Sequence, residues 1–369
     1  MSALVAQPNV AISETAAASE NASSSVTTKT KRILELDALR AIAAINLVLF
    51  HFTWVYAEKF GYSTPLGFRW PFGSYGVEMF FILSGFVNSM SLLRRGKPGA
   101  FVSARLIRIV PLFMLAIGAN VWILQMDPMH QAVEAPQLFA NFTLMPRVLG
   151  FECFDPVMWT LQVEMMFYLL LVTMFKIGAL RRYMIGWGTL LLISYAVCPW
   201  LDAMTADEKA TTTYQVASTL RAFLLLDFVP LFSIGFCLYM IKTKTGMLWA
   251  NIAGVTVSMF VFHSIDHGKH NPAATLLIIG LVTACAYGRV PPLRFKPLVF
   301  VSTISYALYL CHNNLGSVLI HRFDAVGIPP LVCFAIAIAF SFSLAILLTR
   351  WIEQPVTAML RRRFVYRVA

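Results

Sequence analysis

Apolar residues run along this chain in long stretches separated by short polar segments. Ten of these stretches approach the ~20 residues that a helix needs to cross a bilayer. They lie at 36–57, 73–92, 107–126, 157–177, 183–201, 222–241, 247–264, 272–288, 298–320 and 329–350. The pattern predicts an all-α, polytopic membrane bundle of about ten transmembrane helices. The segments between them leave no room for a soluble catalytic domain, so any chemistry must occur within the bundle or at its mouths.

The two ends of the chain differ from the apolar body in composition. Residues 1–32 are rich in Ala, Ser, Thr and Asn and contain no apolar run, so we expect a disordered cytoplasmic tail and not a signal peptide. Residues 33–356 form the predicted membrane domain. Residues 357–369 are rich in Arg and are expected to form a basic cytoplasmic tail.

The charge of the chain supports this topology. Residues are 58% hydrophobic and only 13% charged, whereas soluble domains carry roughly 25% charged residues. The net charge of +11 would suggest nucleic acid on a soluble protein. Here most of the 29 Lys and Arg fall in every second segment between the predicted spans, which is the distribution expected of cytoplasmic loops. We therefore predict that both termini are cytoplasmic and that nucleic acid is not a partner. The six Cys include no C-x-x-C pair, which argues against a metal or redox site.

Several ionisable side chains lie within or beside the apolar spans. A charged residue at mid-bilayer costs roughly 2.5–3.5 kcal/mol, so such residues are functional candidates. At ~1.5 Å per residue, Arg40 lies ~6 Å inside the predicted inner face, and His51 and His312 lie ~22 and ~21 Å inside it. Glu164 lies ~10 Å below the outer face. The remaining candidates are Glu78, Asp227, Arg105 and Arg108.

These depths predict two layers. Arg40, Arg105 and Arg108 would form an inner cationic layer suited to phosphates. His51 and Glu164 would meet in an outer layer suited to proton transfer. Structural alternatives stay open for each residue. The arginines could be ordinary positive-inside or snorkelling residues, and the remaining candidates could be satisfied interior groups, with Asp227 best interpreted as a packing hydrogen-bonder.

Six local motifs surround these positions. They are LDALRAIAAINLVLFHF (36–52), SYGVEMFFILSGFV (74–87), ARLIRIVPLF (104–113), WTLQVEMMFYLL (159–170), ISYALYLCH (304–312) and WIEQP (351–355). In this order they resemble the acyltransferase-3 family of integral membrane acyltransferases, and the resemblance runs from about Glu35 to Pro355. The chain departs from the family pattern at Glu78, where Asp is common, at Met165, where a second Glu is common, and at Gln162, where a small residue is common.

The resemblance implies transfer of an acyl group, often acetyl, from cytoplasmic acyl-CoA to a hydroxyl of a cell-envelope or secreted glycan. Acyl-CoA would be a co-substrate, with no bound cofactor and no metal. Besides donor and acceptor, the expected partners are membrane lipids, and the expected location is the bacterial inner (plasma) membrane.

The predicted site combines this resemblance with the two layers. Arg40, Arg105 and Arg108 would hold the CoA phosphates. His51 would act as general base, or take the acyl group itself, with Glu164 orienting its imidazole. Supporting or acceptor-side positions are Glu78, Trp159, Ser305, Tyr306, His312 and Glu353.

Two other functions fit the same sequence features. Intramembrane charges also mark transport paths, so a transporter or exporter of a glycan or small anion is the main alternative. No pair of Gly- or Pro-broken helices repeats between the two halves, which disfavours it. A scaffolding subunit of a glycan-synthesis complex is the third possibility.

Overall fold

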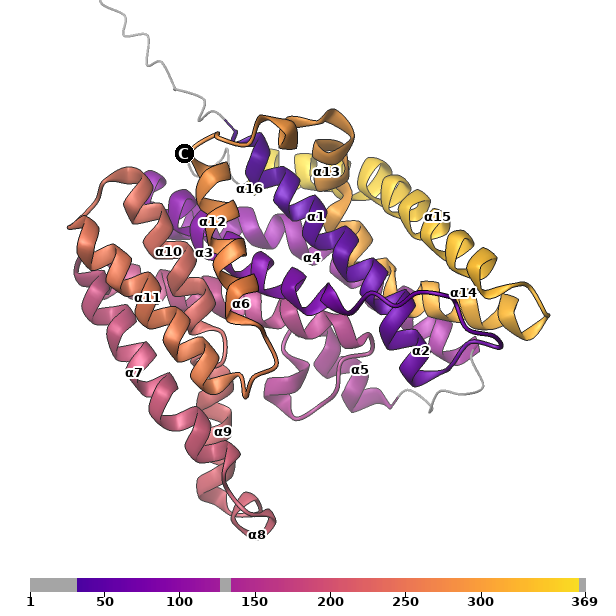
Figure 1. Ribbon diagram of the computed structural model, residues 1–369, viewed down its shortest axis with the longest axis horizontal. Coiled ribbons are helices and arrows are strands. Elements are labelled where there is room, and N and C mark those ends of the chain that lie inside the picture. The colour runs from indigo at the N-terminus through magenta and orange to yellow at the C-terminus, as the bar shows by residue number, and fades with distance from the viewer. Residues whose placement is uncertain (1–31, 127–133, 365–369) are drawn as a thin grey trace, which may run out of the picture. The chain divides into compact units, whose positions relative to one another are not determined.

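The computed structural model describes residues 32–126 and 134–364, and the residues from Ile33 onward form one compact unit. Every regular element in these ranges is a helix (Figure 1). The helices are α1 Leu34–Phe50, α2 Tyr56–Lys59, α3 Ser74–Arg95, α4 Pro98–Met126, α5 Ala135–Phe142, α6 Trp159–Lys176, α7 Tyr183–Asp202, α8 Ala206–Lys209, α9 Thr212–Phe223, α10 Val229–Thr243, α11 Leu248–Ile265, α12 Pro272–Ala286, α13 Lys296–Cys311, α14 Asn313–Ala325, α15 Pro330–Leu348 and α16 Gln354–Phe364.

Ten apolar helical segments occupy the positions of the ten predicted spans. Seven are long and apolar enough to cross a membrane, and α10, α12 and α13 are shorter apolar helices. The prediction of an all-α, polytopic membrane bundle is confirmed. The predicted N-terminal tail lies outside the described residues except for Arg32. At the other end, α16 carries the helix on through the first part of the predicted basic tail, and residues 365–369 lie outside the described range.

The most extensive contact between two helices joins α3 and α10, which lie side by side in Figure 1. Gly85 and Gly235 allow this close approach. A Cβ atom on Gly85 would lie 2.3 Å from the Phe232 carbonyl oxygen, and one on Gly235 would lie 2.0 Å from the Ile82 carbonyl oxygen. Without a hydrophobic driving force between helices in lipid, such small residues permit the tight packing that holds them together. Helix α1 packs on α3 and α13 and so lies along the same core.

Two predicted spans have different bounds in the structure. The stretch 298–320 is not one helix, because α13 ends at Cys311 and α14 begins at Asn313. His312 lies between them, and its Nδ1 is 2.9 Å from the Tyr309 carbonyl oxygen, which the Asn313 amide would take in a continuous helix. The stretch 222–241 begins as a helix only at Val229, after a turn that follows α9.

Two helices contain a π-helical turn, a rare feature that is frequent at functional sites. One, His51–Val55, follows α1 and begins with His51. The other, Thr349–Glu353, joins α15 to α16 and ends with Glu353. Both turns therefore contain a residue that the sequence analysis selected.

Helix α4 passes through Pro111 without breaking. Proline cannot donate to the carbonyl four residues earlier, which is that of Ile107. The Thr357 hydroxyl of α16 lies 3.5 Å from that oxygen, and the Tyr306 hydroxyl of α13 donates to the nearby Ile109 carbonyl at 2.7 Å. Side chains from neighbouring helices thus compensate for the missing bond, and they fix α4 next to α13 at the level of its arginines.

Candidate active site

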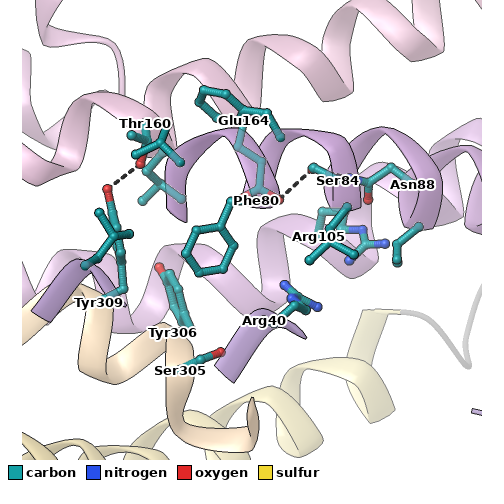
Figure 2. Close-up of a pocket in the computed structure, with 16 residues that line it drawn as sticks. Arg40, Phe80, Ser84, Asn88, Arg105, Thr160, Glu164, Ser305, Tyr306 and Tyr309 are labelled. Atoms are coloured by element: carbon teal, nitrogen blue, oxygen red, sulfur yellow. Dashed lines mark hydrogen bonds between the residues drawn. The ribbon is translucent and has the colours of Figure 1, made fainter. Parts of the chain in front are cut away.

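A cavity with about 820 Å³ of empty volume lies between α1, α3, α4, α6 and α13. We call it the arginine cavity, because Arg40 and Arg105 line it together with Glu164, Ser305 and Tyr306. Figure 2 shows Arg40 and Arg105 reaching toward the same space from different helices. The structure therefore brings together two of the three arginines predicted to form the inner layer.

Positive charge outweighs negative charge around this cavity. Arg40 interacts electrostatically with Arg105, Arg108 and Glu164. Arg108 does not line the cavity, and its Nε lies 3.9 Å from a carboxylate oxygen of Glu353. Arg40 and Arg105 are thus the guanidinium groups available to an anion in the arginine cavity.

Glu164 belongs to the arginine cavity and is not the partner of His51. Its carboxylate accepts hydrogen bonds from Ser84 Oγ at 3.2 Å and from the Tyr168 hydroxyl, and Asn88 donates to Ser84 at 2.7 Å. The predicted pairing of Glu164 with His51 is therefore wrong. Depth along a helix axis does not fix lateral position, and α6 turns this side chain toward the arginines.

A second cavity, with about 1170 Å³ of empty volume, lies against the end of α1 and the starts of α6 and α14. We call it the histidine cavity, since His51 and His321 line it with Trp159 and Asn314. His312 lies directly behind His51 and is fully buried. Its Nε2 is 3.2 Å from His51 Nδ1, so an imidazole takes the position that was predicted for a carboxylate.

The surroundings of the two imidazoles determine their tautomers. His312 Nδ1 lies 3.0 Å and 2.9 Å from the carbonyl oxygens of Leu308 and Tyr309. Carbonyls only accept, so His312 carries its proton on Nδ1 and its Nε2 is an acceptor. His51 Nδ1 must then donate, and it is shared between His312 Nε2 and the Leu47 carbonyl at 2.8 Å. This leaves His51 Nε2 with its lone pair free, which is what a general base requires.

The arginine and histidine cavities share a wall. Leu47, Val77, Thr160 and Tyr309 line both. The Tyr309 hydroxyl is hydrogen-bonded to the Thr160 hydroxyl, as Figure 2 shows, and donates to the Val157 carbonyl. These two hydrogen-bonded side chains therefore form part of the wall between the arginine cavity and the histidine cavity.

The other predicted supporting residues fall in different places. Ser305 and Tyr306 line the arginine cavity, and Glu353 lies beside Arg108, so all three lie with the arginines. Trp159 lines the histidine cavity. Glu78 lines a third cavity, which shares Val77 and Phe81 with the arginine cavity and adjoins the histidine cavity as well.

Sequence reasoning missed the support of the histidine cavity. Asp155 is buried in the segment before α6 and accepts from Asn313 Nδ2 at 2.8 Å and from the Asn314 amide at 3.3 Å. Burial raises the pKa of Asp155 to about 6, although these hydrogen bonds oppose the rise. The Asn pair directly after His312 was the available signal, because two amides inside an apolar stretch need a polar partner.

Comparison with known proteins agrees with the sequence motifs. The model of the acyltransferase-3 family, described as an acyltransferase domain, matches residues 33–350. The chain is 27% identical to the exopolysaccharide production protein ExoZ of Rhizobium meliloti (strain 1021), over 85% of this chain and 95% of that protein. It is 24% identical to the provisionally named acetyltransferase ORF330 of Acidianus two-tailed virus, over 83% of this chain and 88% of that protein.

A third relative is longer than this chain. A provisionally named O-acetyltransferase of Staphylococcus aureus (strain COL) is 24% identical over 89% of this chain but only 58% of its own length. No match was found among solved structures.

Proposed function

The chain belongs to the acyltransferase-3 family of integral membrane acyltransferases, and we propose that it transfers an acetyl group from acetyl-CoA to a hydroxyl of an envelope or secreted glycan. The observation that carries this proposal is the pair of adjoining cavities, one lined by the guanidinium groups of Arg40 and Arg105 and the other by the imidazole of His51. The donor enters from the cytoplasmic side, in line with the charge bias of the loops.

The arginine cavity holds the phosphates of the donor. Arg40 and Arg105 come from different helices, so together they can contact different oxygens of one phosphate group. Glu164 stays bonded to Ser84 and Tyr168 and limits the positive charge of the empty cavity. The flexible arm of the donor then passes between Tyr309 and Thr160 and brings its thioester into the histidine cavity.

His51 carries out the proton transfer. Its Nε2 takes the proton of the acceptor hydroxyl while the hydroxyl oxygen attacks the thioester carbonyl. The tetrahedral intermediate collapses with loss of the CoA thiolate, which receives the proton from His51. His312 stabilises the imidazolium, because its Nε2 accepts from His51 Nδ1. In the alternative order, His51 takes the acetyl group first and the acceptor displaces it.

The relatives support a polysaccharide acceptor without identifying it. ExoZ is named for exopolysaccharide production, and two further relatives are provisionally named as acetyl- or O-acetyltransferases. The proposed acetyl group and glycan acceptor therefore rest on these names and on the family. The proposed positions of the CoA phosphates and of the proton transfer rest on the geometry of the two cavities.

The test uses the full chain reconstituted in lipid nanodiscs with labelled acetyl-CoA and deacetylated envelope polysaccharide. We expect label in the polysaccharide and one free CoA for each group transferred. The same chain reconstituted in sealed vesicles tests the alternative, because uptake of polysaccharide without release of CoA would show a transporter.

A further inference from the structure

A third cavity lies between the starts of α3 and α10, the ends of α7 and α11, and the segment after α11. Its empty volume is about 1130 Å³. Its polar lining includes Glu78, Asp266, His270 and Arg221. It shares Ser74, Val77 and Trp159 with the histidine cavity, so the two are neighbours at the same end of the bundle.

Glu78 has a buried carboxylate oxygen that a ligand in this cavity could hydrogen-bond. Its side chain is only 2% exposed, and its Oε2 accepts from the Thr275 hydroxyl at 2.9 Å. Its Oε1 is buried and has no hydrogen-bond partner. His270 Nε2 lies 3.6 Å from Oε1, beyond hydrogen-bonding distance. A buried carboxylate oxygen without a donor is costly, so a donor from a ligand would stabilise it.

Asp266 fixes the orientation of the His270 ring from the side opposite Glu78. His270 Nδ1 lies 2.6 Å from Asp266 Oδ1, and the His270 backbone amide donates to Asp266 Oδ2 at 2.7 Å. The ring therefore carries a proton on Nδ1 and presents Nε2 toward Glu78. Nε2 and Oε1 together offer two acceptors for hydroxyl groups at one side of the cavity.

The charges disfavour an anionic ligand. Every nitrogen of the Arg221 guanidinium already donates to Asp202 or Asp227, at distances from 2.6 to 3.2 Å. The carboxylates that line the cavity outnumber its permanent cations. Among the described residues, no group of three or more His, Cys, Asp and Glu has the geometry to hold a metal ion. Neutral hydroxyl groups are the ligand that this lining fits.

Aromatic rings form the boundary toward the histidine cavity. Trp159 packs on Phe228 with ring centroids 5.3 Å apart, and both rings line the third cavity. The apolar face of a sugar ring packs on such surfaces while its hydroxyl groups take hydrogen bonds at the edge. Trp159 also lines the histidine cavity, which His51 lines too, so this ring faces both cavities.

We propose that the third cavity is the acceptor site, that it binds a neutral sugar unit through Glu78 and His270, and that Trp159 positions the sugar toward His51. The proposal rests on the proposed function, because it takes the hydroxyl acceptor of that reaction as its ligand. It goes further by naming an uncharged polyol as the substrate class and by excluding a phosphate- or carboxylate-bearing sugar at this subsite.

Equilibrium binding in the absence of acetyl-CoA tests the cavity apart from the reaction. The probes are labelled neutral oligosaccharides of glucose, galactose or N-acetylglucosamine, with a glucuronate-containing oligosaccharide for comparison, and the full chain is held in nanodiscs. We expect wild type to bind at least one neutral probe and to bind the uronate about tenfold more weakly or worse. Glu78→Gln should weaken neutral binding about tenfold, because the neutral amide is a poorer partner than the carboxylate.

The control is Glu58→Gln, the same substitution at an exposed residue paired with Arg69, and it should bind as wild type does. His270→Ala should weaken binding in the same direction, which keeps the test valid if Glu78→Gln does not fold. Failure of every neutral probe to bind wild type, or unchanged binding by the folded Glu78 and His270 variants, would overturn the proposal. Loss of acetyl transfer with sugar binding intact would instead count against the proposed function alone.

Discussion

The arginine and histidine cavities adjoin but are built in different ways. Arg40, Ser84, Arg105 and Glu164 all project from the interior of regular helices. The histidine cavity is built where helices are irregular or end, at the π-helical turn that begins with His51 and at the break that His312 makes between α13 and α14. Regular helices place charged side chains at fixed positions, but their backbone carbonyl groups are already engaged in the helix.

Irregular backbone, in contrast, leaves carbonyl groups that can accept hydrogen bonds from side chains. In a helix interior each carbonyl already accepts a backbone amide, whereas the end of α13 leaves the Tyr309 carbonyl for His312 Nδ1. That carbonyl fixes the tautomer of His312, and His312 in turn fixes that of His51. The comparison indicates that anion binding here depends on charge placement, while proton transfer depends on backbone groups that only a disrupted helix provides.

The largest expected effect is that of removing the base. His51→Ala should lower kcat for acetyl transfer by ~10²–10⁴-fold, the usual contribution of a positioned general base. The KM for acetyl-CoA should change little, because the arginine cavity is intact. His263→Ala, which removes another partly buried imidazole from α11, is the matched control. Near-normal transfer by His51→Ala would show that the histidine cavity is not where the reaction occurs.

The next effect tests which residue positions His51. His312→Ala should lower kcat by roughly 10- to 100-fold by letting the imidazole move, and it should shift the acidic limb of the pH–kcat profile. His312→Gln, whose amide oxygen can accept from His51 Nδ1, should recover part of the activity. Glu164→Gln should leave that limb in place. A pH profile that responds to Glu164 and ignores His312 would restore the pairing that the structure contradicts.

A smaller effect is expected in the arginine cavity. Arg105→Ala should raise the KM for acetyl-CoA about tenfold with kcat nearly unchanged, since a charge-assisted hydrogen bond to phosphate is lost. Arg108→Ala should raise it less, because Arg108 faces Glu353 and does not line the cavity. Equal effects of the two substitutions, or a loss confined to kcat, would contradict the assigned donor position.

The smallest effect concerns the support of the histidine cavity. Burial holds the pKa of Asp155 at about 6, above its value of about 3.9 in an unfolded chain. The folded state therefore binds this proton more tightly. The resulting stabilisation, up to about 3 kcal/mol, is complete below pH 4 and is lost as pH rises through 6.

Melting temperatures at pH 5 and pH 7.5 measure this contribution. The wild-type value should fall more between these conditions than that of Asp155→Asn, which has no titrating group. Glu152→Gln, at an exposed neighbour, should behave as wild type does. Parallel curves for wild type and Asp155→Asn would rule out the assigned pKa.

Hydropathy predicted the helices because lipid imposes a minimum length of apolar residues on each span. It could not predict the break at His312, which depends on one side chain competing for one carbonyl. Arg40 and Arg105 could be placed in one cavity from depth alone, since cations gather at one end of the bundle. The partner of His51 could not be predicted from depth, because residues at similar depth on different helices face different neighbours according to helix order and tilt. The segment Asp266–His270 offered a signal in its i, i+4 pair of carboxylate and imidazole, which was not used.

The π-helical turn at His51–Val55 has a consequence for how this site can be damaged. Such a turn holds about one residue more than an α-helical turn, so the residues beyond it are rotated by ~100° relative to α1. Deleting any one of the four residues that follow His51 in the turn would restore regular winding and rotate α2 and the adjoining loop by more than a quarter of a revolution. The number of residues in this turn is therefore a requirement of the site in addition to their identity. Deletions and insertions can test it, whereas point substitutions cannot.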